Sequence, residues 1–246
     1  MKTFRADLHL HSVLSPCGDL EMSPGNIVEE AYRKGIDIIG ITDHNTTRHA
    51  ALVTRLAEKK GIFVMTGAEI NTIEEIHCLV FFENTDTLTL LQEYIDDNLP
   101  DIHNIPKIFG HQVEVDEYEN IIYEEKRLLA SAIRKSITEL EKFVHLNRGL
   151  FIPSHIDRLK NSIYSQLGLL PENLNADALE VSRATTIEKF AQVHPEIRKY
   201  TLTRSSDAHQ LCDIGKETTT FLIEKADFNE IRMALAGKGG RRLITA

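Results

Sequence analysis

The chain has 246 residues, 42% of them hydrophobic, which is enough to bury one barrel-sized core or two ordinary domains. Its net charge of −9, without a basic run, argues against duplex nucleic acid as a partner, although metal ions can recruit phosphates to an acidic protein. Three cysteines without framework spacing, and no signal-like or membrane-length apolar segment, predict a soluble cytoplasmic protein with no membrane partner.

Short apolar runs alternate with helical patterns along most of the chain. Residues 4–10 alternate as a strand does, and Ser23-Pro24 predicts the start of a helix that ends near Gly35. A buried strand over 36–41, a helix from about 46 to 60, and strands over 62–65 and 76–82 follow. Further strands are expected over 150–153, 178–181, 200–203 and 219–223.

Strands separated by helices imply parallel pairing through right-handed crossovers. Seven or eight such units in about 250 residues match the size of a β/α barrel. Residues 83–148 break the rhythm, because they are charged and helical in pattern over 88–94, 123–132 and 137–146, with a turn-rich middle over 99–119. We therefore expect residues 1–246 to form one α/β barrel domain, with an insertion at about 83–148 that serves packing or covers the substrate.

Histidine and carboxylate side chains recur where the expected strands end. Both imidazoles of His9 and His11 can meet one cation, because residues i and i+2 of a strand share a face. The remaining members follow or lie on later strands: His44, Glu69, His77, His155, Asp207 and His209. In a β/α barrel these strand ends gather on one face. One ion needs three or four ligands, so this set predicts a multinuclear site, bridged by Glu69, for zinc, manganese or iron.

Several of these segments, in this order, resemble the motifs of the PHP (polymerase and histidinol phosphatase) superfamily. They are Asp7–Ser12, Ile41–Asn45, Gly67–Glu69, the segment around His155, and Ser206–His209. The resemblance implies a distorted (β/α)7 barrel with two or three divalent metal ions that support phosphoester hydrolysis.

The resemblance also implies how the ligands are shared among the ions. One metal lies among His9, His11, Glu69 and Asp207. Glu69 reaches a second metal, which is held by His77 and His155. A third metal binds His44, His209 and one residue of the loop after His11.

That loop departs from the family pattern, which often has Asp or His there. This chain reads Ser15-Pro16-Cys17-Gly18-Asp19. We favour Cys17 as a thiolate ligand, which suits zinc, with Asp19 as the alternative and an unliganded Cys17 as a third option.

Other polar residues are candidates for supporting roles. Asp7 and Asp43 are expected either to orient the neighbouring imidazoles or to cap a helix or turn. Arg158 and Arg183 are expected to bind a phosphate or else to be ordinary surface residues, with Arg48 and Arg204 as weaker candidates. We interpret the remaining histidines as bystanders, although His103 and His111 in the insertion can instead reach the substrate: His49, His103, His111, His145 and His194.

Hydrolysis by a metal-activated water needs no side-chain nucleophile, which fits a chain that lacks a convincing Ser/His/Asp or Cys/His arrangement. We favour a phosphomonoesterase acting on a small-molecule phosphate ester. Two alternatives stay open. A nuclease or phosphodiesterase for nucleic-acid ends is disfavoured by low basic charge and by the lack of an aromatic stacking motif. A non-catalytic, metal-stabilised module is disfavoured by the nearly complete ligand set.

Overall fold

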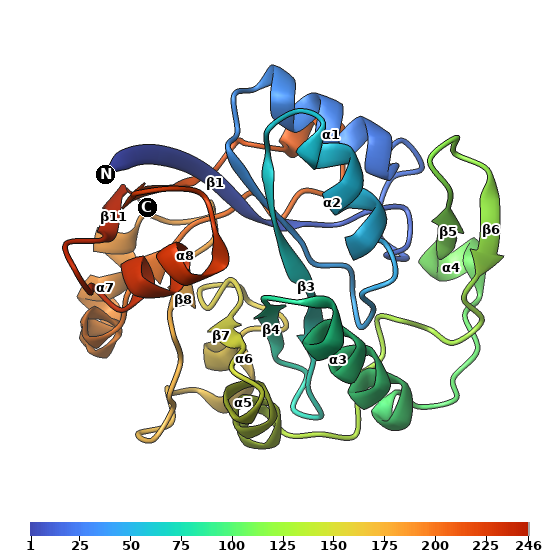
Figure 1. Cartoon of the computed structure of the whole chain (residues 1–246). Helices are drawn as coiled ribbons and strands as arrows, with labels where there is room; N and C mark the ends of the chain where they lie inside the picture. The colour runs from blue at the N-terminus through green and yellow to red at the C-terminus, as the bar shows by residue number, and fades with distance from the viewer. Residues whose placement is uncertain (246) are drawn as a thin grey trace.

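The computed structural model describes residues 1–245 and centres on one curled, seven-stranded mixed sheet (Figure 1). From one edge to the other the strands are β11 (Arg242–Thr245), β10 (Thr219–Ile223), β1 (Lys2–Leu10), β2 (Ile38–Ile41), β3 (Phe63–Asn71), β4 (His77–Phe82) and β7 (Leu150–Pro153). A separate parallel pair consists of β8 (Leu179–Glu180) and β9 (Leu202–Thr203). The α/β class is therefore as predicted, whereas the hydrogen-bonded strands of the described chain form one open sheet and two separate pairs, the second of which lies within residues 83–148.

The direction of the strands corrects one expectation. β1, β2 and β3 run parallel as predicted, but β4 is antiparallel to both β3 and β7, and β10 is antiparallel to β1. Only residues 72–76 separate β3 from β4, and a parallel crossover needs a dozen residues or more. The short connection thus forces an antiparallel hairpin between them.

Helices cover the sheet from both sides (Figure 1). The helix α1 (Pro24–Arg33) begins as predicted, since Ser23 caps it by accepting a hydrogen bond from the backbone N–H of Asn26. The helix α2 (Ala50–Glu58) begins four residues later than predicted. After residue 148 come α6 (Ile163–Leu167), α7 (Ile187–Val193) and α8 (Phe228–Leu235), with 3₁₀ turns η1 (Pro195–Lys199) and η2 (Leu211–Asp213).

The segment over 83–148 has two parts with different relations to the core. Its helices α3 (Thr85–Asn98) and α5 (Ile137–Leu146) pack against the core through residues such as Leu91 and Leu140. Between them lie the short helix α4 (Pro106–Phe109) and a hairpin of β5 (Val113–Val115) and β6 (Ile121–Glu124), at the margin of the molecule (Figure 1). The expected helix over 123–132 is wrong, because the β-branched and aromatic residues Ile121-Ile122-Tyr123 pair with β5 instead.

Large apolar side chains fill the space between the sheet and the helices. Phe81, Phe82, Phe151 and Phe221 are almost fully buried there. This packing fixes the strand ends, and with them the polar residues that follow. Among the described residues, no helix is both long enough and apolar enough to cross a membrane.

Candidate metal centre

One edge of the sheet carries most of the predicted ligands, and the strand directions explain why. His9 lies near the end of β1 and His11 follows it, while Glu69 lies inside β3, which continues to Asn71 rather than ending before Glu69 as predicted. His77 is the first residue of β4 and lies on the strand predicted over 76–82. Because β4 is antiparallel to β3, its first residue lies at the same edge as the last residues of the parallel strands.

Two further ligand candidates are held in unusual backbone conformations. His155 follows β7 with φ of 29°, and Asp207 follows β9 with φ of 51°. L-residues rarely adopt positive φ, and such strain is found preferentially at functional sites. Both side chains are almost completely buried, so the surrounding packing maintains these conformations.

Glu69 is the centre of the cluster. Its Oε1 lies 3.2 Å from His9 Nε2, His77 Nδ1 and His155 Nε2. Its Oε2 lies 3.2 Å from His44 Nδ1 and 3.4 Å from His11 Nε2. A single buried carboxylate thus touches five imidazoles from four segments of the chain, which is the geometry expected of a bridging ligand.

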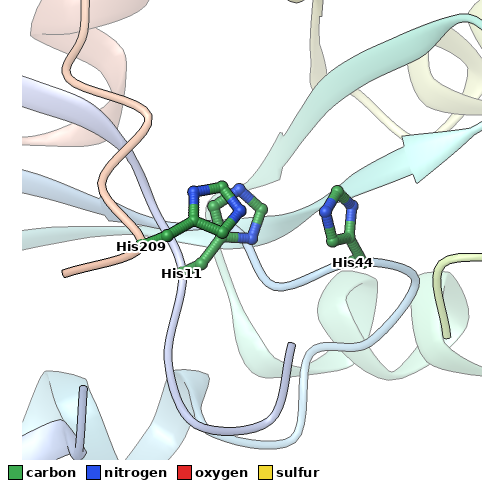
Figure 2. Close-up of side chains that lie close together, drawn as sticks. All are labelled: His11, His44 and His209. Atoms are coloured by element: carbon green, nitrogen blue, oxygen red, sulfur yellow. The ribbon is translucent and has the colours of Figure 1, made fainter. Parts of the chain in front are cut away.

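The ligand atoms fall into three groups, each with atoms within 4.8 Å of one another: His9, His11, Glu69 and Asp207; His44, Glu69 and His77; and His11, His44 and His209. In the third group, shown in Figure 2, the rings of His11 and His209 stack with centroids 4.2 Å apart, and His44 faces them. The first group matches the predicted set. In the second group, His44 takes the place that was predicted for His155. His155 Nε2 nevertheless lies 3.2 Å from Glu69 Oε1, the oxygen that His77 also approaches.

Several buried atoms of this cluster need a partner that the protein does not supply. His44 Nδ1, His155 Nδ1 and Asp207 Oδ1 are buried without a hydrogen bond. An unsatisfied buried polar group costs about 1–3 kcal/mol, and a cation bound by those lone pairs removes that cost. The donor set of imidazole and carboxylate suits zinc, manganese or iron, so these residues fit divalent ions.

Contacts within the cluster shift the pKa values of several of its members. Burial opposes charge on His11, but the adjacent carboxylates of Asp207 and Glu69 outweigh it and raise the pKa of His11 to about 9. Burial and the charge of His11 lower the pKa of His209 to about 4. Burial alone would raise the pKa of Glu69, yet His9 and His77 hold it well below its usual range. Metal binding would release the extra proton of His11, because imidazole ligands must be neutral.

The loop after His11 brings Cys17, rather than Asp19, toward the cluster. Cys17 Sγ lies 3.0 Å from Nε2 of His209. The carboxylate of Asp19 instead accepts a hydrogen bond from the backbone N–H of Glu21, and so closes a local turn. Of the three options considered from the sequence, the Asp19 ligand is disfavoured by this turn, and the choice between a liganding and a free Cys17 stays a prediction.

Asp7 and Asp43 both anchor loops instead of touching the imidazoles. Asp7 accepts hydrogen bonds from the backbone N–H groups of Ser206 (2.9 Å) and Gly215 (2.7 Å), and thereby fixes the segment before Asp207. Asp43 accepts three hydrogen bonds, each 2.7 Å long, from Ser12 N, Ser12 Oγ and Ser15 Oγ. Both residues therefore fix the loops beside the cluster through hydrogen bonds to backbone and serine groups.

The two predicted phosphate-binding arginines differ in position. Arg158 Nη1 lies 2.5 Å from Oδ2 of Asp207, at the rim of the cluster. Arg183 Nη1 pairs with Asp213 Oδ1 at 3.3 Å, and its side chain is about half exposed. A pocket of about 430 Å³ lies beside the cluster, lined by His77, His155, Asp157, Arg158, Leu159, Lys160, Asn161 and Ala184.

Two residues beside the ligands were not singled out from the sequence. Glu180 Oε1 accepts a hydrogen bond from His9 Nδ1 at 3.0 Å and another from the backbone N–H of His155 at 3.2 Å. Ser15 Oγ lies 3.0 Å from Nδ1 of His11. Such partners orient a ligating imidazole and fix its tautomer. The signal for Glu180 was a carboxylate at the end of an otherwise apolar predicted strand.

The interpretation of the remaining histidines as bystanders needs one correction. His49 is buried and hydrogen-bonds to Ser12 Oγ, next to the cluster. The others make contacts elsewhere, such as His145 with Asp177 and His111 with Glu124.

One curated protein and several solved structures resemble this chain over nearly its full length. The Bacillus subtilis protein YqxK, described as uncharacterized, is 26% identical, and the match covers 99% of this chain and 65% of YqxK. The lesion-specific endonuclease EndoQ of Pyrococcus furiosus superposes with a TM-score of 0.71 at 20% identity, over 99% of this chain and 58% of EndoQ. EndoQ has also been solved with a 27-mer duplex that carries an abasic lesion at its active site. This chain therefore spans less than two thirds of both proteins.

A third relative has a similar length to this chain. A putative metal-dependent phosphoesterase from Bifidobacterium adolescentis superposes with a TM-score of 0.62 at 20% identity, over 94% of this chain and 95% of its own. At 20% identity, these superpositions show that the two solved structures have the same fold as this chain. The sequence model of the PHP domain matches residues 7–184, and the chain therefore belongs to the PHP family, whose members are metal-dependent phosphoesterases.

Proposed function

We propose that the chain is a hydrolase of phosphodiesters that uses divalent ions bound around Glu69. The observation that carries the proposal is the buried carboxylate of Glu69 within 3.4 Å of five imidazole nitrogens. The residues that would hold the ions are His9, His11, His44, Glu69, His77, His155, Asp207 and His209, with Cys17 completing the group around His209. Bound divalent ions supply Lewis-acid activation of the phosphoryl group and of water.

The chain's own residues position these ligands and the ester. Glu180 orients His9, and Ser15 orients His11, so that the Nε2 atoms of both rings face Glu69 and Asp207. Arg158 lies where the pocket meets the cluster, and there it can bind a phosphoryl oxygen. The pocket is within the size range that accommodates small-molecule groups, so one substituent of the ester fits beside His77 and His155.

The charge around the site favours a diester over the monoester that the sequence suggested. Both candidate arginines already pair with carboxylates, Arg158 with Asp207 and Arg183 with Asp213. A phosphomonoester brings about −1.5 to −2 charges at neutral pH, more than the single charge of a diester. A diester therefore needs fewer positively charged side chains that are free of a carboxylate partner. The whole-chain likeness to EndoQ, which was solved with a DNA duplex, supports a nucleic-acid strand as the substrate.

The test compares three substrates after loading with Mn²⁺ or Zn²⁺: p-nitrophenyl phosphate, its bis-ester, and an end-labelled oligonucleotide. We expect kcat/KM for the bis-ester to exceed that for the monoester by about tenfold or more, and the oligonucleotide to be cleaved. Asp207→Asn should abolish turnover, whereas Asp213→Asn, which alters a carboxylate outside the Glu69 cluster, should retain it. Turnover without added metal in the presence of a chelator would contradict the proposal.

A phosphomonoesterase is the second candidate, and two observations favour it. The net charge of −9 disfavours a long polyanion, and the Bifidobacterium phosphoesterase matches this chain over almost its entire length. Preferential hydrolysis of the monoester in the same assay would select this candidate.

A further inference from the structure

A continuous chain of buried hydrogen bonds connects the β5–β6 hairpin to the metal centre. The backbone N–H of Val115 in β5 donates to His49 Nε2 at 3.0 Å. His49 Nδ1 contacts Ser12 Oγ at 2.7 Å, and Ser12 Oγ donates to Asp43 Oδ2 at 2.7 Å. From the other side, Ser15 Oγ donates to Asp43 Oδ1 at 2.7 Å and contacts His11 Nδ1 at 3.0 Å.

The chemistry of these groups fixes the direction of every bond. The N–H of Val115 can only donate, so Nε2 of His49 accepts and its proton must be on Nδ1, which donates to Ser12. Asp43 can only accept while it is ionised, so both serine hydroxyls give it their protons. Ser15 Oγ must then accept from Nδ1–H of His11, and in the neutral ring that binds a metal the lone pair is therefore on Nε2 of His11. That lone pair faces Glu69 and Asp207.

The members of this relay are too well buried for water to replace them. His49, Ser12, Asp43, Ser15 and His11 each have at most 2% of their surface exposed. Burial also lowers the pKa of His49, which agrees with the neutral ring that an acceptor Nε2 requires. Loss of one member therefore leaves buried donors or acceptors without partners, and the neighbouring groups must rearrange.

We infer that His49 is a positioning residue of the metal centre, which links the seating of the β5–β6 hairpin to the orientation of His11 through Ser12, Asp43 and Ser15. This inference rests on the proposed function only in requiring that His11 binds a metal. It gives the hairpin a role beyond packing, because the backbone of Val115 selects the tautomer of His49.

Three substitutions at one position separate the two sides of His49. His49→Phe keeps an aromatic ring and removes both hydrogen bonds. His49→Asn keeps an amide donor near the position of Nδ1, and His49→Gln keeps an acceptor near that of Nε2. His145→Phe is the matched control, since His145 hydrogen-bonds to Asp177 and Asn175, outside both the hairpin and the Glu69 cluster.

The experiment titrates Co²⁺ into each metal-free variant and records the visible d–d absorption spectrum, the Co²⁺ dissociation constant and the Tm. We expect His49→Phe and His49→Gln to weaken Co²⁺ binding about tenfold and to alter the spectrum, and His49→Asn to stay within about threefold of wild type. His145→Phe should lower the Tm while it leaves the spectrum unchanged.

Three results would overturn the inference. A wild-type spectrum and affinity in His49→Phe would show that His49 only fills space. Equal behaviour of His49→Asn and His49→Gln would break the link through Ser12. Because those two variants are compared with each other, this test holds even where His49→Phe does not fold. A wild-type protein that binds no Co²⁺ would remove the proposed function itself, and the inference with it.

Discussion

Glu69→Gln is the substitution whose consequence can be counted in whole ions. Glu69 belongs to two of the three ligand groups, whereas His209 belongs to one. If each group holds one ion, the wild-type protein should bind three, Glu69→Gln should keep one, and His209→Gln should keep two. The amide of Gln keeps the volume of the side chain but carries no charge to bridge two cations.

The same count predicts the loss of stability. An ion present at 100 times its dissociation constant stabilises the folded state by about 2.7 kcal/mol. Glu69→Gln should therefore forfeit about 5 kcal/mol of metal-dependent stability, and His209→Gln about 2.7 kcal/mol. For a chain of this size each kcal/mol corresponds to about 2–4 °C, so the losses in Tm are about 10–20 °C and about 5–10 °C.

The assay is elemental analysis of Mn²⁺-loaded, desalted protein, with the Tm measured by calorimetry before and after chelation. Chelation supplies the control, because metal-free Glu69→Gln and metal-free wild type should then differ far less than the loaded proteins do. A Glu69→Gln protein that retains the wild-type number of ions would refute the bridging role. A larger loss in His209→Gln than in Glu69→Gln would refute the assignment of groups.

Three further predictions concern single residues. Arg158→Ala should raise KM for the bis-ester about tenfold, while Arg183→Ala, which removes an arginine paired with Asp213, should leave it nearly unchanged; equal effects would remove Arg158 from the substrate site. Phe151→Ala should lower the free energy of unfolding in urea by about 3–5 kcal/mol, because Phe151 is fully buried, and a loss below about 1 kcal/mol would show that the core adjusts freely. The hydrogen bond from His145 to Asp177 raises the pKa of His145, so its stabilisation is complete below the unfolded pKa of about 6.5 and disappears as pH rises through the folded pKa. His145→Gln should thus cost up to about 1 kcal/mol near pH 5.5 and nothing near pH 9, whereas a loss that is the same at both values would contradict the pairing.

The sequence predicted the ligand-bearing strand ends well because each carries a local signal. His9 lies near the end of β1 with His11 two residues later, and His155, Asp207 and His209 each follow a predicted strand. Histidines and carboxylates that recur at strand ends can converge whatever the exact sheet topology. The parallel pairing assigned to β4 was wrong. His77 nevertheless lies at the same edge as Glu69, because convergence does not depend on the direction of its strand.

The parts that could not be predicted depend on contacts between distant segments. Glu180 reaches His9 across 171 positions of the chain, and His49 reaches Val115 across 66. Nothing near His49 in sequence distinguishes it from a helix-capping residue. The hairpin over 113–124 was missed for a related reason. The β-branched runs of β5 and β6 are short and lie among charged residues, so the sequence pattern does not indicate strands, and their pairing is seen only in the tertiary structure.

The most direct test of the proposed centre is a crystal structure of the Mn²⁺-loaded protein with anomalous scattering data. We expect two anomalous peaks beside the carboxylate of Glu69, one among His9, His11 and Asp207 and the other between His44 and His77. Ions bound only elsewhere on the molecule, or an ordered Glu69 cluster without an anomalous peak at saturating Mn²⁺, would contradict it.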